Sequence, residues 1–195
     1  MMRTGYRDES PLQRAPSFLL TGPLHGGKTT CLREIMTLLE PRGFRVSGFI
    51  ASGMMKDGTR TGFILEDLRT GGSTLLSTTT PKPDTVRWGR FYFTREGIEA
   101  GFRALSWENT PVPDLTVVDE VGPFELRDGI WAHHLDEMAI ISPRPFLWVV
   151  REALVDQVIE HWHLLHPQVF RIPLDAGQAT DTIENAIEDW KLTRV

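Results

Sequence analysis

One stretch of the sequence has the residue types and the spacing of a phosphate-binding loop. Residues 22–29 read GPLHGGKT, which matches the pattern G-x-x-x-x-G-K-[ST]. Glycines in this pattern let the backbone curl so that its N–H groups point at a phosphate chain, which larger side chains would block. A helix that begins at the end of the loop adds the positive end of its dipole behind those groups. This chemistry fits the triphosphate of a nucleotide such as ATP or GTP.

Each position of this phosphate loop has an expected role. Lys28 should reach the β- and γ-phosphates, and the Thr29 hydroxyl should bind Mg²⁺. The residues predicted to surround the nucleotide are Gly22, Pro23, Leu24, His25, Gly26, Gly27, Lys28, Thr29 and Thr30. The alternative is a glycine-rich turn with a solvated lysine. The apolar run Phe18–Thr21 before the loop and the amphipathic stretch after it argue against that alternative.

Two acidic residues follow a later apolar run. Residues 115–120 read LTVVDE, a buried strand that ends in Asp119 and Glu120. An acid at the carboxyl end of a parallel strand lies at the sheet edge where ligands bind. We therefore expect Asp119 in the Mg²⁺ shell beside Thr29, and Glu120 as the general base for a water, a role worth about 10²- to 10⁴-fold in rate. Taken alone, the two residues also fit a solvated pair before a turn.

The elements that must position these residues follow from the apolar patterning. Short apolar or alternating runs predict strands near residues 18–21, 45–52, 61–67, 73–77, 89–93, 115–118, 145–150 and 169–172. Helical spacing predicts helices that begin at Lys28 and after Thr94, and further helices near residues 130–138, 154–162 and 183–190, with Asp181 and Glu184 in the first turn of the last one. The alternation predicts an α/β fold with a mostly parallel sheet flanked by helices. The turn-rich segment 45–93, with a hairpin turn at residues 56–58, predicts an antiparallel region.

Composition limits the class of protein. The chain has 195 residues, of which 41% are hydrophobic and 24% charged, as is typical of a soluble domain. We expect a flexible tail over residues 1–16 and one domain over residues 17–195. Cys31 is the only cysteine, so it forms no intrachain disulfide, and it is expected to pack in or near the core. The absence of a signal-peptide pattern and of long apolar runs predicts a cytoplasmic protein with no membrane contact, and the net charge of −5 argues against a nucleic-acid partner.

With these residues in view, the chain resembles the small P-loop nucleoside-triphosphatases typified by the thermophile NTPase. The resemblance rests on the phosphate loop and on VVDEVGPFEL, VSGFIAS…GTRTGFILEDLRTG and GRFYF, and it runs from about residue 18 to about residue 162. It implies a RecA-like P-loop fold and slow, Mg²⁺-dependent hydrolysis of several nucleoside triphosphates. It would place Lys28 and Thr29 on the phosphates and the metal, Asp119 in the metal shell, and Glu120 as the base. His25 departs from the pattern, because the family usually has glycine there. The histidine either adds a phosphate contact or narrows the mouth of the site.

Phosphoryl transfer also uses a cation on the developing charge. Arg151 directly follows the strand near residues 145–150 and is our candidate for this role, with a surface arginine that opens the next helix as the alternative. Arg87, Arg90 and Arg95 flank the aromatic strand, and they either approach the nucleotide or form a solvated strand face.

Glu125 and three histidines are further candidates for supporting roles. Glu125 either orients neighbouring groups or lies on the surface. His161, His163 and His166 do not predict zinc, because only the last two could share a helical face and two ligands do not close a zinc site. Base recognition is expected from the late loop Ile172–Gln178, where no residue selects one base.

Three functions fit these observations. The first is hydrolysis of a nucleoside triphosphate. The second is a nucleotide or small-molecule kinase, which needs an acceptor pocket and usually an arginine-bearing lid; the segment from Pro145 to Leu154 is too short for a long lid. The third is a nucleotide-dependent adaptor that resembles the molybdopterin-guanine dinucleotide accessory proteins.

Overall fold

The computed structural model describes residues 15–107 and 111–194 and contains one sheet of nine strands, in the order β5-β6-β4-β3-β2-β7-β8-β1-β9. The strands are β1 (Ser17–Gly22), β2 (Val46–Lys56), β3 (Thr59–Asp67), β4 (Ser73–Thr78), β5 (Thr85–Trp88), β6 (Phe91–Thr94), β7 (Leu115–Val121), β8 (Phe146–Arg151) and β9 (Gln168–Arg171). The helices are α1 (Lys28–Leu39), α2 (Arg95–Leu105), α3 (Ala132–Asp136), α4 (Val155–His161) and α5 (Ala176–Leu192). Short 3₁₀ or π-helical turns are η2 (Glu40–Arg42), η3 (Glu125–Arg127), η4 (Glu137–Ile141) and η5 (Glu152–Leu154).

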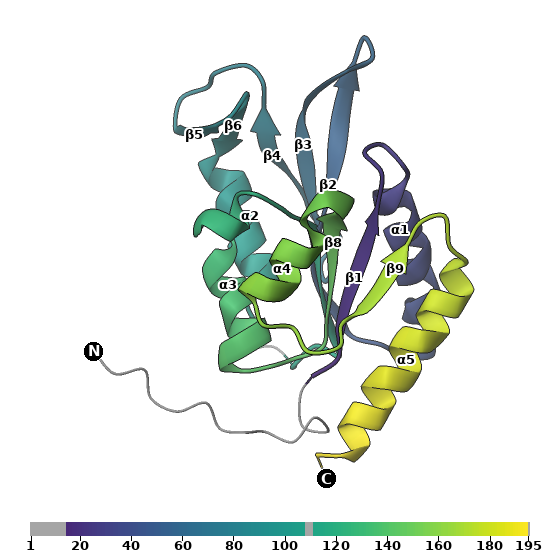
Figure 1. Cartoon of the computed structure of the whole chain (residues 1–195). Helices are drawn as coiled ribbons and strands as arrows, with labels where there is room; N and C mark the ends of the chain where they lie inside the picture. Colours follow the sequence, from purple (N-terminus) through teal and green to yellow (C-terminus); the bar gives the residue numbers. More distant parts are fainter. Residues whose placement is uncertain (1–14, 108–110, 195) are drawn as a thin grey trace.

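The sheet has a parallel half and an antiparallel half that meet at β2 (Figure 1). Strands β2, β7, β8, β1 and β9 are parallel to their neighbours in this group, whereas β3, β4, β6 and β5 pair antiparallel. The predicted α/β fold with an antiparallel region is therefore confirmed. The antiparallel half is larger than expected because β5, a strand that the apolar pattern does not predict, pairs with β6 through a hairpin at Gly89.

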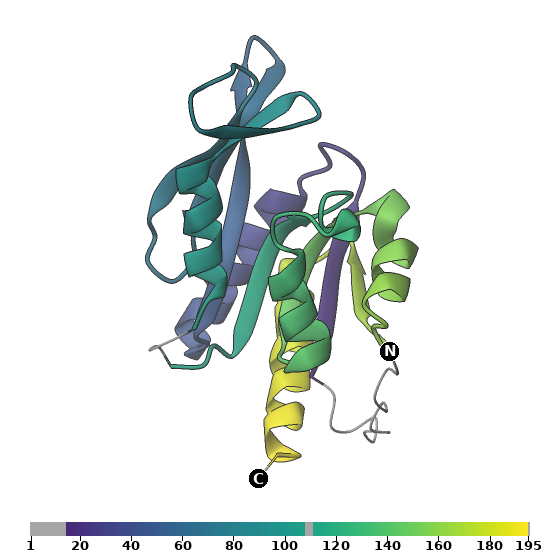
Figure 2. The same cartoon turned by 90° about the vertical axis from the view of Figure 1, so that its left-hand side faces the viewer.

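Helices cover both faces of the parallel half and produce two apolar cores (Figures 1 and 2). Side chains of α1 and α5 fill the core on one face, and side chains of α2, α3 and α4 fill the core on the other. Strand β1 contributes side chains to both cores, because Leu19 packs in one core while Phe18 and Leu20 pack in the other. Each of these fully buried side chains contributes about 1.5–3 kcal/mol. The strand before the phosphate loop is therefore fixed from both sides.

Most predicted elements are confirmed within a few residues. The hairpin turn lies at Asp57 and Gly58, which both have positive φ angles, and the Thr94 hydroxyl accepts a hydrogen bond from the Gly97 N–H at 3.0 Å as the N-cap of α2. Strand β7 runs on to Val121, so Asp119 and Glu120 lie within the strand rather than after it.

The predicted start of the last helix is wrong. Helix α5 begins at Ala176, where the Asp175 side chain accepts a hydrogen bond from the Gln178 N–H at 3.0 Å. Asp181 and Glu184 therefore lie beyond the first turn. Both instead bind Arg42, with 2.8 Å between the Arg42 Nη1 and the Asp181 Oδ1. Asp175, an N-cap residue in an irregular segment, thus determines where this helix begins.

The expected tail over residues 1–16 lies, except for its last two residues, outside the part of the chain that the structure describes. Among the described residues, no helix combines the length and the apolar character that a membrane span requires.

Candidate active site

The phosphate loop connects β1 to α1 at the carboxyl end of the parallel strands (Figure 1). The Gly26 N–H donates a hydrogen bond to the Pro23 carbonyl at 3.0 Å, which closes a tight curl. A β-carbon at Gly26 would lie 2.8 Å from the Pro23 Cγ, and Gly27 has a φ of 91°, a conformation that favours glycine. Both glycines are therefore needed for the loop to form just before the first turn of α1.

Lys28 lies inside this curl. Its side chain is 8% exposed, and its Nζ donates hydrogen bonds to the carbonyls of Gly22 at 3.2 Å and Pro23 at 3.1 Å. The ammonium group is thus held among backbone groups of the loop, at the place where a bound phosphate oxygen would meet it. The N–H groups of the loop and of the first turn of α1, together with Lys28, are of the kind that binds a phosphate group.

Thr29 and Asp119 are brought into contact from elements that are far apart in the sequence. The Thr29 Oγ1 donates a hydrogen bond to the Asp119 Oδ2 at 3.0 Å. Burial raises the pKa of Asp119 to about 7, although the hydrogen bond from Thr29 and the charge of Lys28 lower it. A hydroxyl and a carboxylate are oxygen ligands of the kind that Mg²⁺ binds, and a divalent cation would stabilise the ionised form of this buried acid. The pair fits a Mg²⁺ ion.

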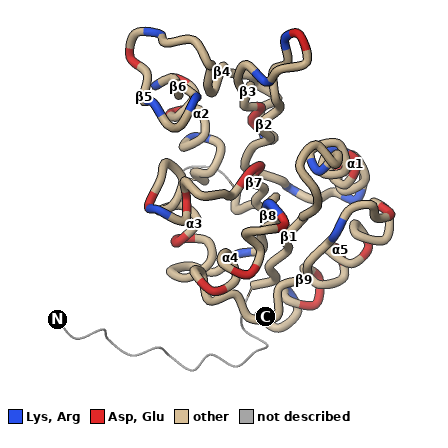
Figure 3. Tube along the Cα trace, turned by 45° about the horizontal axis from the view of Figure 1, so that its top comes forward, with Lys and Arg blue, Asp and Glu red and all other residues tan. Residues whose placement is uncertain are grey.

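Arg151 and Glu120 meet at the same edge of the sheet. Strand β8 lies between β1 and β7, so Arg151 pairs with Gly22 on one side while its Nε donates a hydrogen bond to the Glu120 Oε1 on the other. In Figure 3, which looks toward this edge, the acidic end of β7 lies beside the basic end of β8. Arg151 thus lies beside Glu120 at this edge of the sheet, and its role on the developing charge stays a prediction. Its side chain is also about half exposed, as a residue at the mouth of a site would be.

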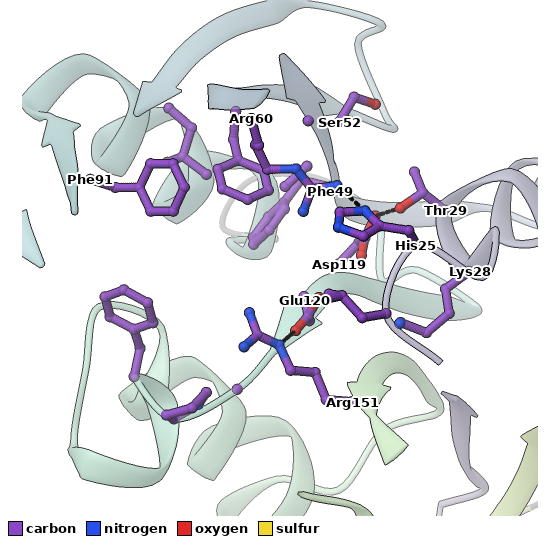
Figure 4. A pocket seen from close by; sticks show the side chains of 18 of the residues that line it. His25, Lys28, Thr29, Phe49, Ser52, Arg60, Phe91, Asp119, Glu120 and Arg151 are labelled. Atoms are coloured by element: carbon purple, nitrogen blue, oxygen red, sulfur yellow. Dashed lines mark hydrogen bonds and ion pairs between the residues drawn. The ribbon is translucent and has the colours of Figure 1, made fainter. Parts of the chain in front are cut away.

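An arginine that the sequence analysis missed faces the phosphate loop from the antiparallel half. The Arg60 Nη2 lies 3.4 Å from the His25 Nδ1, and the Arg60 guanidinium also lies over the Phe63 ring at 5.2 Å (Figure 4). His25 is therefore at the rim of the site, where it faces β3. The only sequence signal for Arg60 is its place in the segment GTRTGF that carries the family resemblance.

The other arginine candidates do not approach the nucleotide site. Arg87 lies over the Tyr92 ring at 5.8 Å, and Arg90 lies over the Phe91 ring at 4.9 Å. Neither of them, nor Arg95 at the start of α2, lines the cavity described below. Of the two alternatives for these arginines, the structure therefore favours the exposed strand face, where the guanidinium groups of Arg87 and Arg90 lie over neighbouring rings.

A cavity of about 450 Å³ connects the phosphate loop to an apolar compartment (Figure 4). Its polar end contains Lys28, Thr29, Asp119, Glu120 and Arg151. Its other end, which we call the aromatic chamber, is lined by Phe49, Phe63, Leu76, Phe91, Phe93, Phe124, Ile130 and Trp131. These side chains come from β2, β3, β4, β6 and the segment after β7. The sequence shows the aromatic residues but not their gathering beside the phosphate loop.

Glu125 is buried, so the surface position considered for it is wrong. Its side chain is 3% exposed and lines the cavity, and its Oε2 accepts a hydrogen bond from the Gly122 N–H at 2.9 Å. Burial raises the pKa of this carboxyl to about 7, and the backbone hydrogen bonds that it accepts lower it. Glu125 therefore fixes the turn that follows the acidic pair.

The late loop lies against the phosphate loop from the other side. A β-carbon at Gly22 would overlap the Ile172 Cγ1, so the two segments are in close contact. None of residues 172–178 lines the cavity. Base recognition by this loop stays a prediction.

Cys31, on α1, is partly buried against the core between α1 and α5, as expected. Among the described residues, no group of three or more His, Cys, Asp or Glu side chains is arranged to hold a metal ion.

Comparison with known proteins gives consistent matches. The model of a family described as NTPase matches residues 17–174. The nucleoside-triphosphatase THEP1 of Thermofilum pendens is 34% identical over 138 residues, which cover 71% of this chain and 75% of the relative. That of Caldivirga maquilingensis is 29% identical over 145 residues, with 74% and 80% covered.

Two solved structures share the fold. The solution structure of a human cancer-related nucleoside triphosphatase has a TM-score of 0.65 at 21% identity and covers 89% of this chain and 98% of that one. The crystal structure of THEP1 from Aquifex aeolicus has a TM-score of 0.52 at 17% identity, with 87% and 95% covered.

Proposed function

The chain belongs to the NTPase family, and from this premise we propose that it hydrolyses a nucleoside triphosphate to the diphosphate and phosphate with the help of Mg²⁺. The single observation that carries the proposal is the hydrogen bond between Thr29 and Asp119, which joins the phosphate loop to the acidic strand at 3.0 Å. Relatives that match most of the chain are named nucleoside-triphosphatases, which supports the same reaction.

Each polar residue of the site has a role in this reaction. Lys28 and the N–H groups of the loop bind and orient the β- and γ-phosphates. Thr29 and Asp119 would hold Mg²⁺, which neutralises the charge of the phosphate oxygens when bound. Glu120 orients a water on the γ-phosphate and takes its proton. Arg151, held beside Glu120, stabilises the charge that develops on the transferred group.

Phosphate release with saturating Mg²⁺ and ATP tests this proposal. We expect Lys28→Ala to lose nearly all turnover, and Glu120→Gln to lose about 10²- to 10³-fold while it still binds nucleotide. A chelator should abolish turnover in the wild type. Lys56→Ala, at the exposed end of β2 and outside the cavity, is the matched control and should keep the wild-type rate. Equal rates in all variants would refute the proposal.

A further inference from the structure

Binding of phosphate groups at the phosphate loop does not account for the aromatic chamber at the other end of the cavity. The chain of phosphates is bound by polar groups at one end of the cavity, yet the other end is apolar and formed almost entirely by rings. Phe49, Leu76, Phe93 and Trp131 are each no more than 8% exposed, so this wall is already packed. Such a compartment, with a few polar groups at one end, is the usual form of a small-molecule site.

Contacts between rings hold the chamber open in a defined shape. The ring centroids of Phe49 and Trp131 are 5.1 Å apart, and those of Phe63 and Phe91 are 5.2 Å apart in an edge-on arrangement. These are favourable aromatic geometries, so each pair stabilises the wall in addition to burying area. A preformed apolar wall of this kind binds an apolar molecule without a large ordering cost.

Glu120, the proposed general base, lines the same cavity as the chamber. Thr29, Asp119 and Glu120 mark the γ-phosphate end of the site. Figure 4 shows Arg60 and Glu120 between Lys28 and the aromatic side chains. In phosphoryl transfer, the attacking and leaving oxygens lie roughly in line on opposite sides of the phosphorus. If the triphosphate lies along the phosphate loop as proposed, with its γ-phosphate beside Thr29 and Asp119, a molecule in the chamber would approach the γ-phosphate from the side opposite the leaving diphosphate.

The volume and the charges of the cavity define the class of molecule. About 150 Å³ of apolar space is enough for benzene, and the whole cavity, which includes the phosphate loop at its polar end, has about 450 Å³. Among the ionisable side chains that line the cavity, Arg60 lies over the Phe63 ring at 5.2 Å, and Glu125 is buried with its Oε2 accepting a hydrogen bond from the Gly122 N–H. The chamber thus fits an uncharged aromatic body with its polar end directed at Glu120.

We propose that the aromatic chamber is the binding site for a small aromatic alcohol, to which the protein transfers the γ-phosphoryl group. The inference rests on the proposed binding of the triphosphate at the phosphate loop. In the transfer, the bond between the γ-phosphorus and the β–γ bridging oxygen breaks, and a bond from the γ-phosphorus to the alcohol oxygen forms. The hydroxyl proton passes to the Glu120 carboxylate and then to water. The products are the nucleoside diphosphate and a phosphate monoester, and hydrolysis is the same step with water in place of the alcohol.

The experiment measures how the γ-phosphoryl group partitions between water and an alcohol. The full-length protein is incubated with Mg²⁺, ATP and one of 2-phenylethanol, 2-(1-naphthyl)ethanol or tryptophol. Phosphate and phosphate monoester are then quantified by ³¹P NMR. We expect at least one of these alcohols to give a monoester in an amount equal to the additional ADP. Glycerol, which has hydroxyls but no ring, should give none.

Two phenylalanine variants, one inside and one outside the cavity, test whether the alcohol binds in the aromatic chamber. Phe91→Leu removes a ring from the chamber wall, and we expect the ratio of monoester to phosphate to fall about tenfold, as the loss of one aromatic contact implies. Phe44→Leu, at an equally half-buried position outside the cavity, should keep the wild-type ratio. Lys28→Ala should lose both products.

Three results would overturn the inference. One is a wild type that releases phosphate but forms no monoester with any of the alcohols, which leaves the proposed hydrolysis intact. Another is a Phe91→Leu variant whose KM for ATP rises when no alcohol is present, because the chamber would then hold the nucleotide base. The third is transfer to a nucleoside monophosphate but not to the alcohols. A wild type that forms no ADP under any condition would instead refute the proposed function itself.

Discussion

Replacing Glu125 by glutamine tests whether the Glu125 carboxyl is as shielded from water as its burial indicates. The carboxyl is 3% exposed, and burial raises its pKa from its usual value of 4.5 to about 7. In the unfolded chain the same group titrates near its usual value. Between these two values the folded protein binds a proton that the unfolded chain has released. The free energy of unfolding must therefore fall as the pH rises through this window.

The size of the effect follows from the two pKa values. The difference of about 2.5 pKa units corresponds to a total of ~3 kcal/mol, of which ~2.5 kcal/mol is lost between pH 5 and pH 8. Glu125→Gln has no ionisable group at this position, so its free energy of unfolding lacks this loss. The buried Asp119 also has a raised pKa, but it is present in both proteins and cancels in the comparison.

Urea unfolding, followed by tryptophan fluorescence in the presence of a chelator, measures the effect. The free energy of unfolding is determined at pH 5, 6, 7 and 8 for both proteins, and the wild-type value minus the variant value should decrease steadily with pH. Glu40→Gln, at an exposed position, should follow the wild type at every pH because its carboxyl keeps its water shell. If the wild-type and Glu125→Gln values differ by a constant amount from pH 5 to pH 8, Glu125 is hydrated and the reasoning is wrong.

Three further predictions concern the site and the packing of the elements that carry it. Gly22→Ala should lower the free energy of unfolding by about 1–3 kcal/mol because the new β-carbon overlaps Ile172, and Gly22→Ala combined with Ile172→Ala should recover part of the loss in urea unfolding. A double variant that is no more stable than Gly22→Ala would contradict this steric explanation. Thr29→Ala should raise the Mg²⁺ concentration for half-maximal phosphate release on the order of tenfold, and an unchanged value would remove Thr29 from the metal site. Asp114→Asn should cost about 1–3 kcal/mol at pH 7, because the carboxylate binds Arg45 and a lysine of α5. Burial raises the pKa of Asp114, but these hydrogen bonds outweigh burial and lower it, so the cost should vanish as the pH falls below the lowered value; a cost that persists at pH 3 would show that the charge is not its cause.

The parts of the site that the sequence predicts are those determined by local chemistry. The phosphate loop is a continuous segment in which glycines, a lysine and a threonine have fixed spacing, and the apolar run before it identifies β1. Asp119 and Glu120 are identified because they end an apolar run. Their meeting with Thr29 follows from a general rule, that the carboxyl ends of parallel strands lie at one edge. None of this requires knowledge of side-chain packing.

The parts that the sequence misses depend on distant pairing. Arg60 reaches His25 only because β3 pairs with β2 in one particular register, and the chamber forms only because β4 and β6 continue the same sheet. The burial of Glu125 likewise depends on what packs around the turn after β7. The misplaced start of α5 has a different origin, since Asp175 and Asp181 are both plausible caps and the sequence does not rank them.

The division of the sheet at β2 has a consequence for how such a protein can diverge. The groups that we propose to bind the triphosphate come from β1, α1, β7 and β8, whereas much of the aromatic wall comes from β3, β4 and β6. Substitutions in the antiparallel half can therefore accumulate under selection for a new small molecule while the inherited phosphate chemistry stays intact. Substitutions in the two halves of the sheet can accumulate at different rates. The aromatic residues that line the cavity should therefore vary more between related proteins than the glycines and the lysine of the phosphate loop.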